Sequence, residues 1–294
     1  MSFEIRRVAR AEFATEASEI LSGAWAPPAL HYSPEYVSWQ LDFPGPCEAP
    51  AVAAFVGSLP VGFAAGVHRR VRVAGEAVDV LVVTFVAVLP DYRGQGIVHA
   101  LYARLLADIR QSGLPVITFG RSNSSGQRAI EHAYPAADFP LKAFGEYAGY
   151  AIMPRSVSPG GWNVSTALPP IPLETPLAWS SPTELQFEHY SRDPRKRRLW
   201  MHPDGGWAWA TEIEFVSQKG LETVTTLEAI SGVPLDRLAG LAAAAGEGRL
   251  VQAPNLMGYN PQGLRPIGFR QVSTPWVGYW SGSAPANATN LEII

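Results

Sequence analysis

Residues 82–109, VVTFVAVLPDYRGQGIVHALYARLLADI, decide the fold of this chain. Residues 82–89 form an unbroken apolar run rich in β-branched side chains, which predicts a buried strand. Apolar side chains then recur every four positions across residues 97–109, which predicts a helix with one face against a sheet. Between them, Gly94 and Gly96 let the backbone approach a ligand closely, and the first helical amides have no partner within the helix. The stretch therefore predicts a strand, an anion-binding turn and a helix.

This turn resembles motif A of the GCN5-related N-acetyltransferases (GNAT), in which Arg or Gln is followed by two residues, Gly, one residue, and Gly or Ala. Here Val98 replaces the final small residue. The resemblance implies acetyl-CoA or another acyl-CoA as co-substrate, its pantetheine pairing with strand residues Val86, Ala87 and Val88. Its diphosphate is expected at the turn, on Arg93, Gly94, Gln95, Gly96, Ile97 and Val98. The alternative is an ordinary strand-to-helix connection in another α/β domain.

Composition narrows the class of protein. The chain has 294 residues, 47% of them hydrophobic, which suits two globular domains. A formal net charge of −3 argues against a general nucleic-acid binder. Cys47 is the single cysteine, so no internal disulfide or multi-cysteine metal site is expected, and the histidines show no metal-binding spacing. No signal peptide or membrane span is predicted, so the expected location is the cytoplasm.

The expected fold class is α/β (α+β), with a GNAT-like, mostly antiparallel sheet flanked by helices. Residues 1–153 are expected to form this acyl-CoA-binding domain, and the Pro-rich residues 154–182 a linker. The order of helices and strands recurs loosely in residues 183–294, without a second Arg-Gly-x-Gly turn. A second, degenerate GNAT-like domain is therefore expected there, and an unrelated α+β cap is the alternative.

Three apolar runs separated by turn residues, 51–56, 61–73 and 77–88, predict an antiparallel meander ahead of the turn. Residues 141–153 are strand-like and are expected to complete the first domain. Residues 272–280 are expected to be a strand of the second half. These patterns place the predicted turn at the end of the third strand of a sheet.

Acyl transfer to an amine needs a base for the amine and a proton donor for the leaving thiolate. By resemblance, Tyr134 is the candidate donor and Asn123 lies in the matching cofactor-binding loop; a tyrosine at a helix end also serves packing. No acid occupies the position at which several family members place a catalytic Glu. Asp79 is the nearest acid on the same strand and the candidate base, although strand-end acids are commonly surface charges.

In the resembled family, residues 31–39 lie over the acceptor site. Tyr32, Tyr36 and Trp39 are the candidate acceptor pocket, or alternatively a packed contact between helices. The basic run 192–198 is interpreted as solvated, or as a site for an anion such as the CoA 3′-phosphate.

The predicted function is acyl-CoA-dependent N-acylation, most simply N-acetylation, of a small-molecule amine. The alternatives are a non-catalytic acyl-CoA-binding or regulatory module and a protein or peptide N-acetyltransferase. No nucleic-acid or membrane partner and no metal are expected, and a homodimer is left open.

Overall fold

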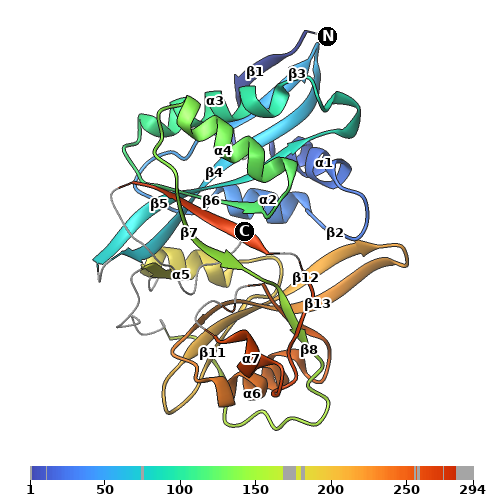
Figure 1. Ribbon diagram of the computed structural model, residues 1–294, viewed down its shortest axis with the longest axis vertical. Helices are drawn as coiled ribbons and strands as arrows, with labels where there is room; N and C mark the ends of the chain where they lie inside the picture. The colour runs from blue at the N-terminus through green and yellow to red at the C-terminus, as the bar shows by residue number, and fades with distance from the viewer. Residues whose placement is uncertain are drawn as a thin grey trace.

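The structure is a computed structural model that describes residues 2–10, 12–73, 76–167, 177–179, 183–254, 256, 259–273 and 275–282. Two sheets of eight strands, each with its own helices, are arranged one above the other in the view of Figure 1. The architecture is mixed α/β with mostly antiparallel sheets flanked by helices, which confirms the predicted fold class. Among the described residues, no helix is both long and apolar enough to cross a bilayer.

The first sheet has the strand order β1-β3-β4-β5-β6-β16-β7, and β10 pairs with β4 beside this path. Its β3–β4–β5 part is the predicted meander, and β6 runs parallel to β5. The strands are β1 (Glu4–Arg7), β3 (Ala51–Val56), β4 (Leu59–Val73), β5 (Glu76–Val88), β6 (Val116–Arg121), β7 (Lys142–Tyr147), β10 (Leu177–Trp179) and β16 (Trp276–Ser281).

Helices cover both faces of the first sheet (Figure 1). The helices are α1 (Ala14–Ala24), α2 (Pro34–Leu41), α3 (Ile97–Arg110) and α4 (Ser125–Ala136), with a 3-10 turn η1 (Pro90–Tyr92) before α3. Helices α3 and α4 bury their apolar side chains on one face, and α1 and α2 pack on the other. This division follows from the alternation of side chains along β4, where Ala64 faces α3 and Ala65 faces α1.

The second sheet has the order β15-β8-β14-β13-β12-β11-β9, with β2 paired to β12. Its core is formed by the Leu- and Ala-rich helix α6 (Leu235–Gly246) against the sheet. The strands are β2 (Ala29–Leu30), β8 (Tyr150–Ile152), β9 (Asn163–Ser165), β11 (Arg198–Met201), β12 (Trp207–Ser217), β13 (Gly220–Ser231), β14 (Val251–Ala253) and β15 (Arg270–Gln271); the other helices are α5 (Glu184–Ser191) and α7 (Pro261–Leu264).

The two sheets exchange strands across the middle of the chain. Residues 141–153 were expected to be one strand of the first domain, but they form β7 in the first sheet and β8 in the second. The chain turns between them at Gly149, whose amide donates to the Ser273 hydroxyl at 2.8 Å and leaves no room for a side chain. Conversely, β16, expected in the second half, inserts between β6 and β7 and appears as the red strand of the upper sheet in Figure 1.

Sheet pairing therefore does not follow the predicted order of domains. The division into domains 1–153 and 183–294 with a linker 154–182 stays a prediction. In the structure, β8 of the first range pairs in the second sheet, and β16 of the last range pairs in the first sheet. The alternation of apolar and polar side chains indicates that a segment is a strand. It does not say which strand lies beside it, because many strands share the same alternation.

Gly278 tests how tightly β16 is held. A Cβ atom there would lie 2.5 Å from Phe144 Cζ and 2.7 Å from Tyr147 Cε2. We expect Gly278→Ala to lower the free energy of unfolding in urea by about 1–3 kcal/mol, because this core has no space for a methyl group. The matched control is Gly126→Ala in α4, where the new Cβ would lie 3.5 Å from its nearest neighbour. Equal stability of the two variants would contradict the packing of β16 described here.

Candidate active site

Strands β5 and β6 separate at the candidate site. They pair in parallel only over Leu81–Val83 and Val116–Thr118. Directly beyond, Phe85 has φ +58°, and Phe85 and Val86 together face Ala64 of β4. This bulge twists β5 away from its neighbour, as bulges beside functional sites commonly do. The two strands therefore stop pairing before the turn, and we call the region between their unpaired ends the opening.

The free edge of β5 follows from the alternation of its hydrogen bonds. The Leu89 amide donates to the Val61 carbonyl of β4 at 2.9 Å, so Ala87, two positions earlier, also directs its polar groups to β4. Val86 and Val88 therefore direct theirs toward the opening. Of the three strand residues predicted to bind the pantetheine, Val86 and Val88 direct backbone groups toward the opening, whereas Ala87 pairs with Phe63 of β4.

The predicted turn is open to solvent. Gly94 and Gly96 have φ of +75° and +81°, and a Cβ atom on either would meet nothing within 4 Å. Among the described residues, the amides of Gly94, Gln95 and Gly96 donate no backbone hydrogen bond. These amides lie at the positive end of α3, with Ile97 buried and Val98 half-buried beneath them. An exposed cradle of unpaired amides at a helix start suits a diphosphate.

Arg93 holds the turn in place as well as supplying charge. Its Nε donates to the Val88 carbonyl at 3.1 Å, and its guanidinium also donates to the carbonyl of Ala24 at the end of α1. One arginine thus links the end of β5, the turn and α1. The carbonyl of Val88 is occupied by this contact, which leaves its amide as the group available to a ligand at that position.

Tyr134 lies in the buried core between α4 and the sheet, with its ring against Tyr102 and Phe139. Burial raises the pKa of its hydroxyl well above the ordinary value, and the nearby Thr118 side chain acts in the opposite direction. This hydroxyl makes no hydrogen bond of standard geometry with any described residue. Because Thr118 is the last residue of β6 paired with β5, the buried Tyr134 packs beside the point where the two strands separate, and it is protonated at neutral pH.

Asn123 lies in the exposed loop before α4, with φ +60°. Its amide donates to Gln127 Oε1 at 2.7 Å, and Gln127 in turn donates to the hydroxyl of Tyr279 at 2.9 Å. Tyr279 belongs to β16 and also donates to Glu131 at 2.6 Å. The exchanged strand therefore holds the loop that was predicted to contact the cofactor.

The structure does not bring Asp79 to this site. It lies four positions before Val83, the last β5 residue paired with β6, about 13 Å away at the rise of an extended strand. It faces Arg70 in the β4–β5 pair, 3.8 Å from its guanidinium. This half-exposed ion pair is in keeping with the alternative for Asp79, a surface charge, and its role as base stays a prediction.

The predicted acceptor residues form an aromatic stack between the two sheets. Tyr32 lies 6.4 Å from Tyr36, which lies 6.1 Å from Trp39, measured between ring centres. Tyr36 and Trp39 are buried and Tyr32 is half-buried. Two hydrogen bonds join Trp39 to His189 of α5. The Trp39 indole donates to the His189 carbonyl at 2.9 Å, and the Trp39 carbonyl lies 2.8 Å from His189 Nε2. Trp39 thus serves packing, whereas Tyr32 and Tyr36 also contact Phe85 of the bulge at 5.9 and 6.4 Å.

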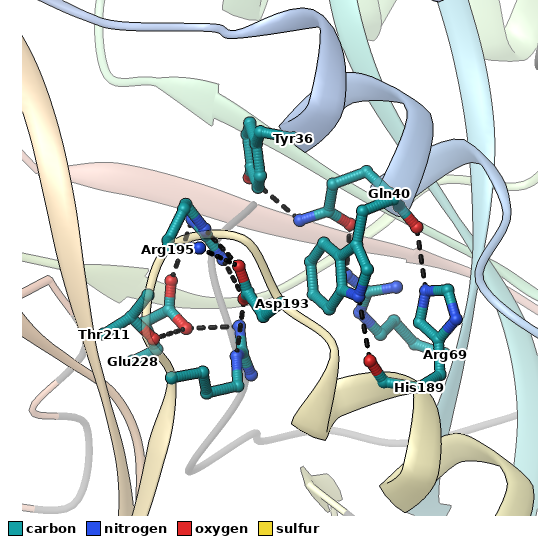
Figure 2. Close-up of polar contacts among 10 residues, drawn as sticks. Tyr36, Gln40, Arg69, His189, Asp193, Arg195, Thr211 and Glu228 are labelled. Atoms are coloured by element: carbon teal, nitrogen blue, oxygen red, sulfur yellow. Dashed lines mark hydrogen bonds and ion pairs between the residues drawn. The ribbon is translucent and has the colours of Figure 1, made fainter.

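Four charged side chains lie beside this stack: Asp193, Arg197 and Glu228 are buried and Arg195 is half-buried. Figure 2 shows Asp193, Arg195 and Glu228 with their polar contacts. Asp193 contacts Arg195 at 3.0 Å and Arg197 at 2.9 Å, and Glu228 of β13 contacts both arginines and the Thr211 hydroxyl. Burial opposes the ionisation of Asp193, but the two arginines outweigh it and lower its pKa. The four charges cancel in sign, so the group is neutral overall.

The network reaches α2 through Arg195, whose Cζ lies 4.0 Å from the centre of the Tyr36 ring. The interpretation of run 192–198 as solvated or anion-binding is therefore wrong for Arg195 and Arg197. Their carboxylate partner Glu228 lies 31 residues after Arg197, so nothing local in the sequence indicates the pairing. Sequence analysis missed this network, and the alternation of Asp193, Arg195 and Arg197 was its only local signal.

A cavity of about 140 Å³ lies next to Arg195, where β2 meets β12. It is lined by side chains of both halves, including His31, Tyr36, Arg195, Glu212 and Glu214. Among the described residues, no three His, Cys, Asp or Glu side chains are grouped to hold a metal ion.

Comparison with known proteins matches residues 4–119 to the model of an "Acetyltransferase (GNAT) domain". No curated protein matches the sequence. Among solved structures, yeast (Saccharomyces cerevisiae) N-myristoyltransferase with bound myristoyl-CoA has a TM-score of 0.66 at 12% identity, over 99% of this chain and 87% of that one. A candidate acetyltransferase of Pyrococcus horikoshii has a TM-score of 0.64 at 16% identity, over 99% and 92%. A GCN5-related N-acetyltransferase of Anabaena variabilis has 0.55 at 13%, over 94% and 72%. At these identities the likeness is one of fold.

Proposed function

We propose, from the match of residues 4–119 to the model of a GNAT acetyltransferase domain, that this protein is an acyl-CoA-dependent N-acyltransferase and that it acts on the amine of a small molecule. The observation that carries the proposal is the opening between β5 and β6, which adjoins an exposed turn with free amides at Gly94, Gln95 and Gly96. A diphosphate fits the turn, and an extended amide chain fits the free edge at Val86 and Val88.

The reaction follows from these placements. The neutral acceptor amine attacks the thioester carbonyl, so that a C–N bond forms and the C–S bond breaks. An outward-facing backbone amide of β5 that is not paired with the pantetheine is the candidate donor to the developing oxyanion. The amine releases its proton to water. The leaving thiolate takes a proton from Tyr134, and the tyrosine regains one from water before the next turnover. Burial keeps the Tyr134 hydroxyl protonated at neutral pH, so the donor is present when the thiolate forms.

The small-molecule acceptor is favoured by the arrangement around the bulge. Helix α2 packs over the site, and behind it pack Tyr190 of α5 and Trp209 of the second sheet. A protein substrate would need an open groove for a polypeptide, whereas this position is covered by both halves of the chain. The acetyl group is proposed as the acyl group because the matched family model is that of an acetyltransferase domain.

The second half is proposed to be a GNAT-like repeat that has lost its cofactor turn. In the first half, the antiparallel pair β4–β5 is followed by α3 and by β6 parallel to β5. In the second half, the pair β12–β13 is followed by α6 and by β14 parallel to β13. The connection from β13 to α6, Gly232-Val233-Pro234, carries no arginine and a single glycine. This order supports a shared topology without a second acyl-CoA site.

The direct test has two parts. Isothermal titration of the full chain with acetyl-CoA should show binding at one site, and release of free CoA should then be followed with a panel of small amines. Binding with turnover supports the proposal. Binding without turnover on any amine would favour the non-catalytic module, and acetylation of peptides in preference to small amines would favour the peptide transferase.

Tyr134→Phe tests the proton donor. We expect kcat to fall by about 10- to 100-fold while the acetyl-CoA dissociation constant is unchanged, because only proton delivery is removed. Tyr102→Phe is the matched control, since Tyr102 is also buried and packs against Tyr134 at 6.0 Å. Equal kcat values for the two variants would exclude Tyr134 from the chemistry.

A further inference from the structure

Phe85 has an unusual backbone conformation just beyond the point where β5 and β6 stop pairing. Its φ of +58° lies in the left-handed region, which residues with bulky side chains rarely adopt. Such torsions persist only where the surrounding structure holds them, and they are frequent at functional sites. The side chain that this torsion places is therefore a candidate for a role in the proposed acyl-CoA site.

Two tyrosines hold the Phe85 ring on the face of the first sheet that α1 and α2 cover. Phe85 is 5% exposed, and its ring packs edge-on against Tyr32 and Tyr36. The tyrosines are fixed in turn, because Ser18 of α1 donates to the Tyr32 carbonyl and Gln40 of α2 donates to the Tyr36 hydroxyl at 2.8 Å. The ring therefore cannot turn aside unless α1 or α2 moves with it.

The path proposed for the acyl-CoA leads toward this ring. From the turn backward along β5, the backbone groups that face the opening belong first to Val88 and then to Val86. Phe85 is the next residue toward Val83 and Thr118, where the two strands pair. A diphosphate on the turn therefore directs the pantetheine from Val88 toward Val86, and the thioester with its acyl group toward Phe85.

The space beyond the thioester is bounded on three sides. In the plane of the sheet, β5 and β6 are already paired at Val83 and Thr118. On the face covered by α3 and α4 lies the buried Tyr134, and on the opposite face lies Phe85, backed by Tyr32. An acetyl group adds one methyl beyond the carbonyl, whereas a longer chain has to displace one of these buried side chains.

We propose that the Phe85 ring closes the space for the acyl group and so restricts this protein to acetyl and other short acyl groups. The inference rests on the proposed function, and it adds the residue that sets the length of the acyl chain. The effect is large enough to measure, because a single methylene group changes selectivity by roughly 10- to 200-fold where an apolar site has to accommodate it.

The test is isothermal titration of the full chain with CoA, acetyl-CoA and octanoyl-CoA. We expect octanoyl-CoA to bind the unchanged protein roughly tenfold or more weakly than acetyl-CoA does. In Phe85→Ala, the space left by the ring can take the chain, so the affinity for octanoyl-CoA should rise by roughly tenfold or more. The affinity for CoA, which carries no acyl group, should be unchanged.

Phe63→Ala is the matched control. Phe63 is buried in the same core, but it lies on β4, one strand away from the opening, and packs against Phe13 at 5.7 Å. It removes the same side chain outside the proposed path, so octanoyl-CoA should still bind weakly. Thermal unfolding should verify that the variants fold. Phe85→Leu and Phe63→Leu are a milder pair for titration with butyryl-CoA, which should gain affinity only in Phe85→Leu.

The outcomes separate this inference from the proposed function. Octanoyl-CoA binding to the unchanged protein as tightly as acetyl-CoA, or equally to the Phe85 and Phe63 variants, overturns the role of Phe85 while the acyl-CoA site stands. Absence of CoA binding overturns the proposed function itself, because CoA does not depend on the space at Phe85. A gain for the longer chain that is confined to the Phe85 variants, at constant CoA affinity, supports the inference.

Discussion

Gly96→Asp is expected to weaken CoA binding by more than 100-fold. Gly96 is the residue before α3, with φ +81°, and its amide belongs to the exposed turn. An aspartate there adds a negative charge beside the site of the diphosphate, at the helix end that favours anions. It also adds a side chain in a backbone conformation that L-residues rarely adopt. Isothermal titration with CoA measures the effect.

Gly113→Asp is the matched control for this variant. Gly113 follows α3 at its opposite end, has φ +69°, and a Cβ atom there would meet nothing within 4 Å. It therefore carries the same backbone strain and the same added charge without facing the turn. We expect its CoA affinity to be unchanged. Equal affinity of Gly96→Asp would show that the diphosphate does not bind these amides, and the proposed function would fail with it.

Glu228→Gln is expected to destabilise the protein by about 3–5 kcal/mol. Glu228 is 4% exposed and contacts Arg195, Arg197 and Thr211. The amide of glutamine preserves the shape but removes the negative charge, which leaves the two arginines with Asp193 as their remaining network acid. Removing one member of a buried ion pair costs far more than the pair contributes, because the other charge stays desolvated. Urea unfolding of the full chain measures the loss.

Glu188→Gln is the comparison for this variant. Glu188 forms an exposed ion pair with Arg192 one helical turn away, and such pairs contribute at most about 0.5 kcal/mol. A Glu228→Gln variant no less stable than Glu188→Gln would contradict the buried network. Because Arg195 stacks on Tyr36, the structure also implies that Glu228→Gln disturbs the acceptor side of the site more than the turn.

The local part of the site could be predicted from sequence, and the distant part could not. The strand, the turn and the helix of residues 82–109 are where they were expected. Ser33 caps the N-terminus of α2, because its hydroxyl accepts a hydrogen bond from the Tyr36 amide at 3.2 Å. Asp79 was chosen as the nearest acid along its strand, and Trp39 by resemblance to the family. The contacts of both residues are with partners far away in the sequence or on another strand, Arg70 for Asp79 and His189 for Trp39, and sequence distance does not reveal these contacts.

The exchange of strands shows the same limit at the level of the fold. Apolar alternation correctly indicated strands near residues 142–152 and 276–281, but it could not say that β8 joins the second sheet and β16 the first. Both strands satisfy the same polarity pattern, and the choice of partner depends on the whole chain.

The sequence by itself determined the glycine turn proposed to bind acyl-CoA, because the geometry of this turn depends on glycine torsions and helix amides within a few residues. The tertiary structure alone decided the membership of the two sheets, the buried group around Glu228 and the cavity lined by His31 and Glu214. Each of these depends on contacts between residues far apart in the chain, 183 positions in the case of His31 and Glu214. Side-chain charge and polarity are local properties, but burial, which sets their energetic effect, is a property of the folded molecule.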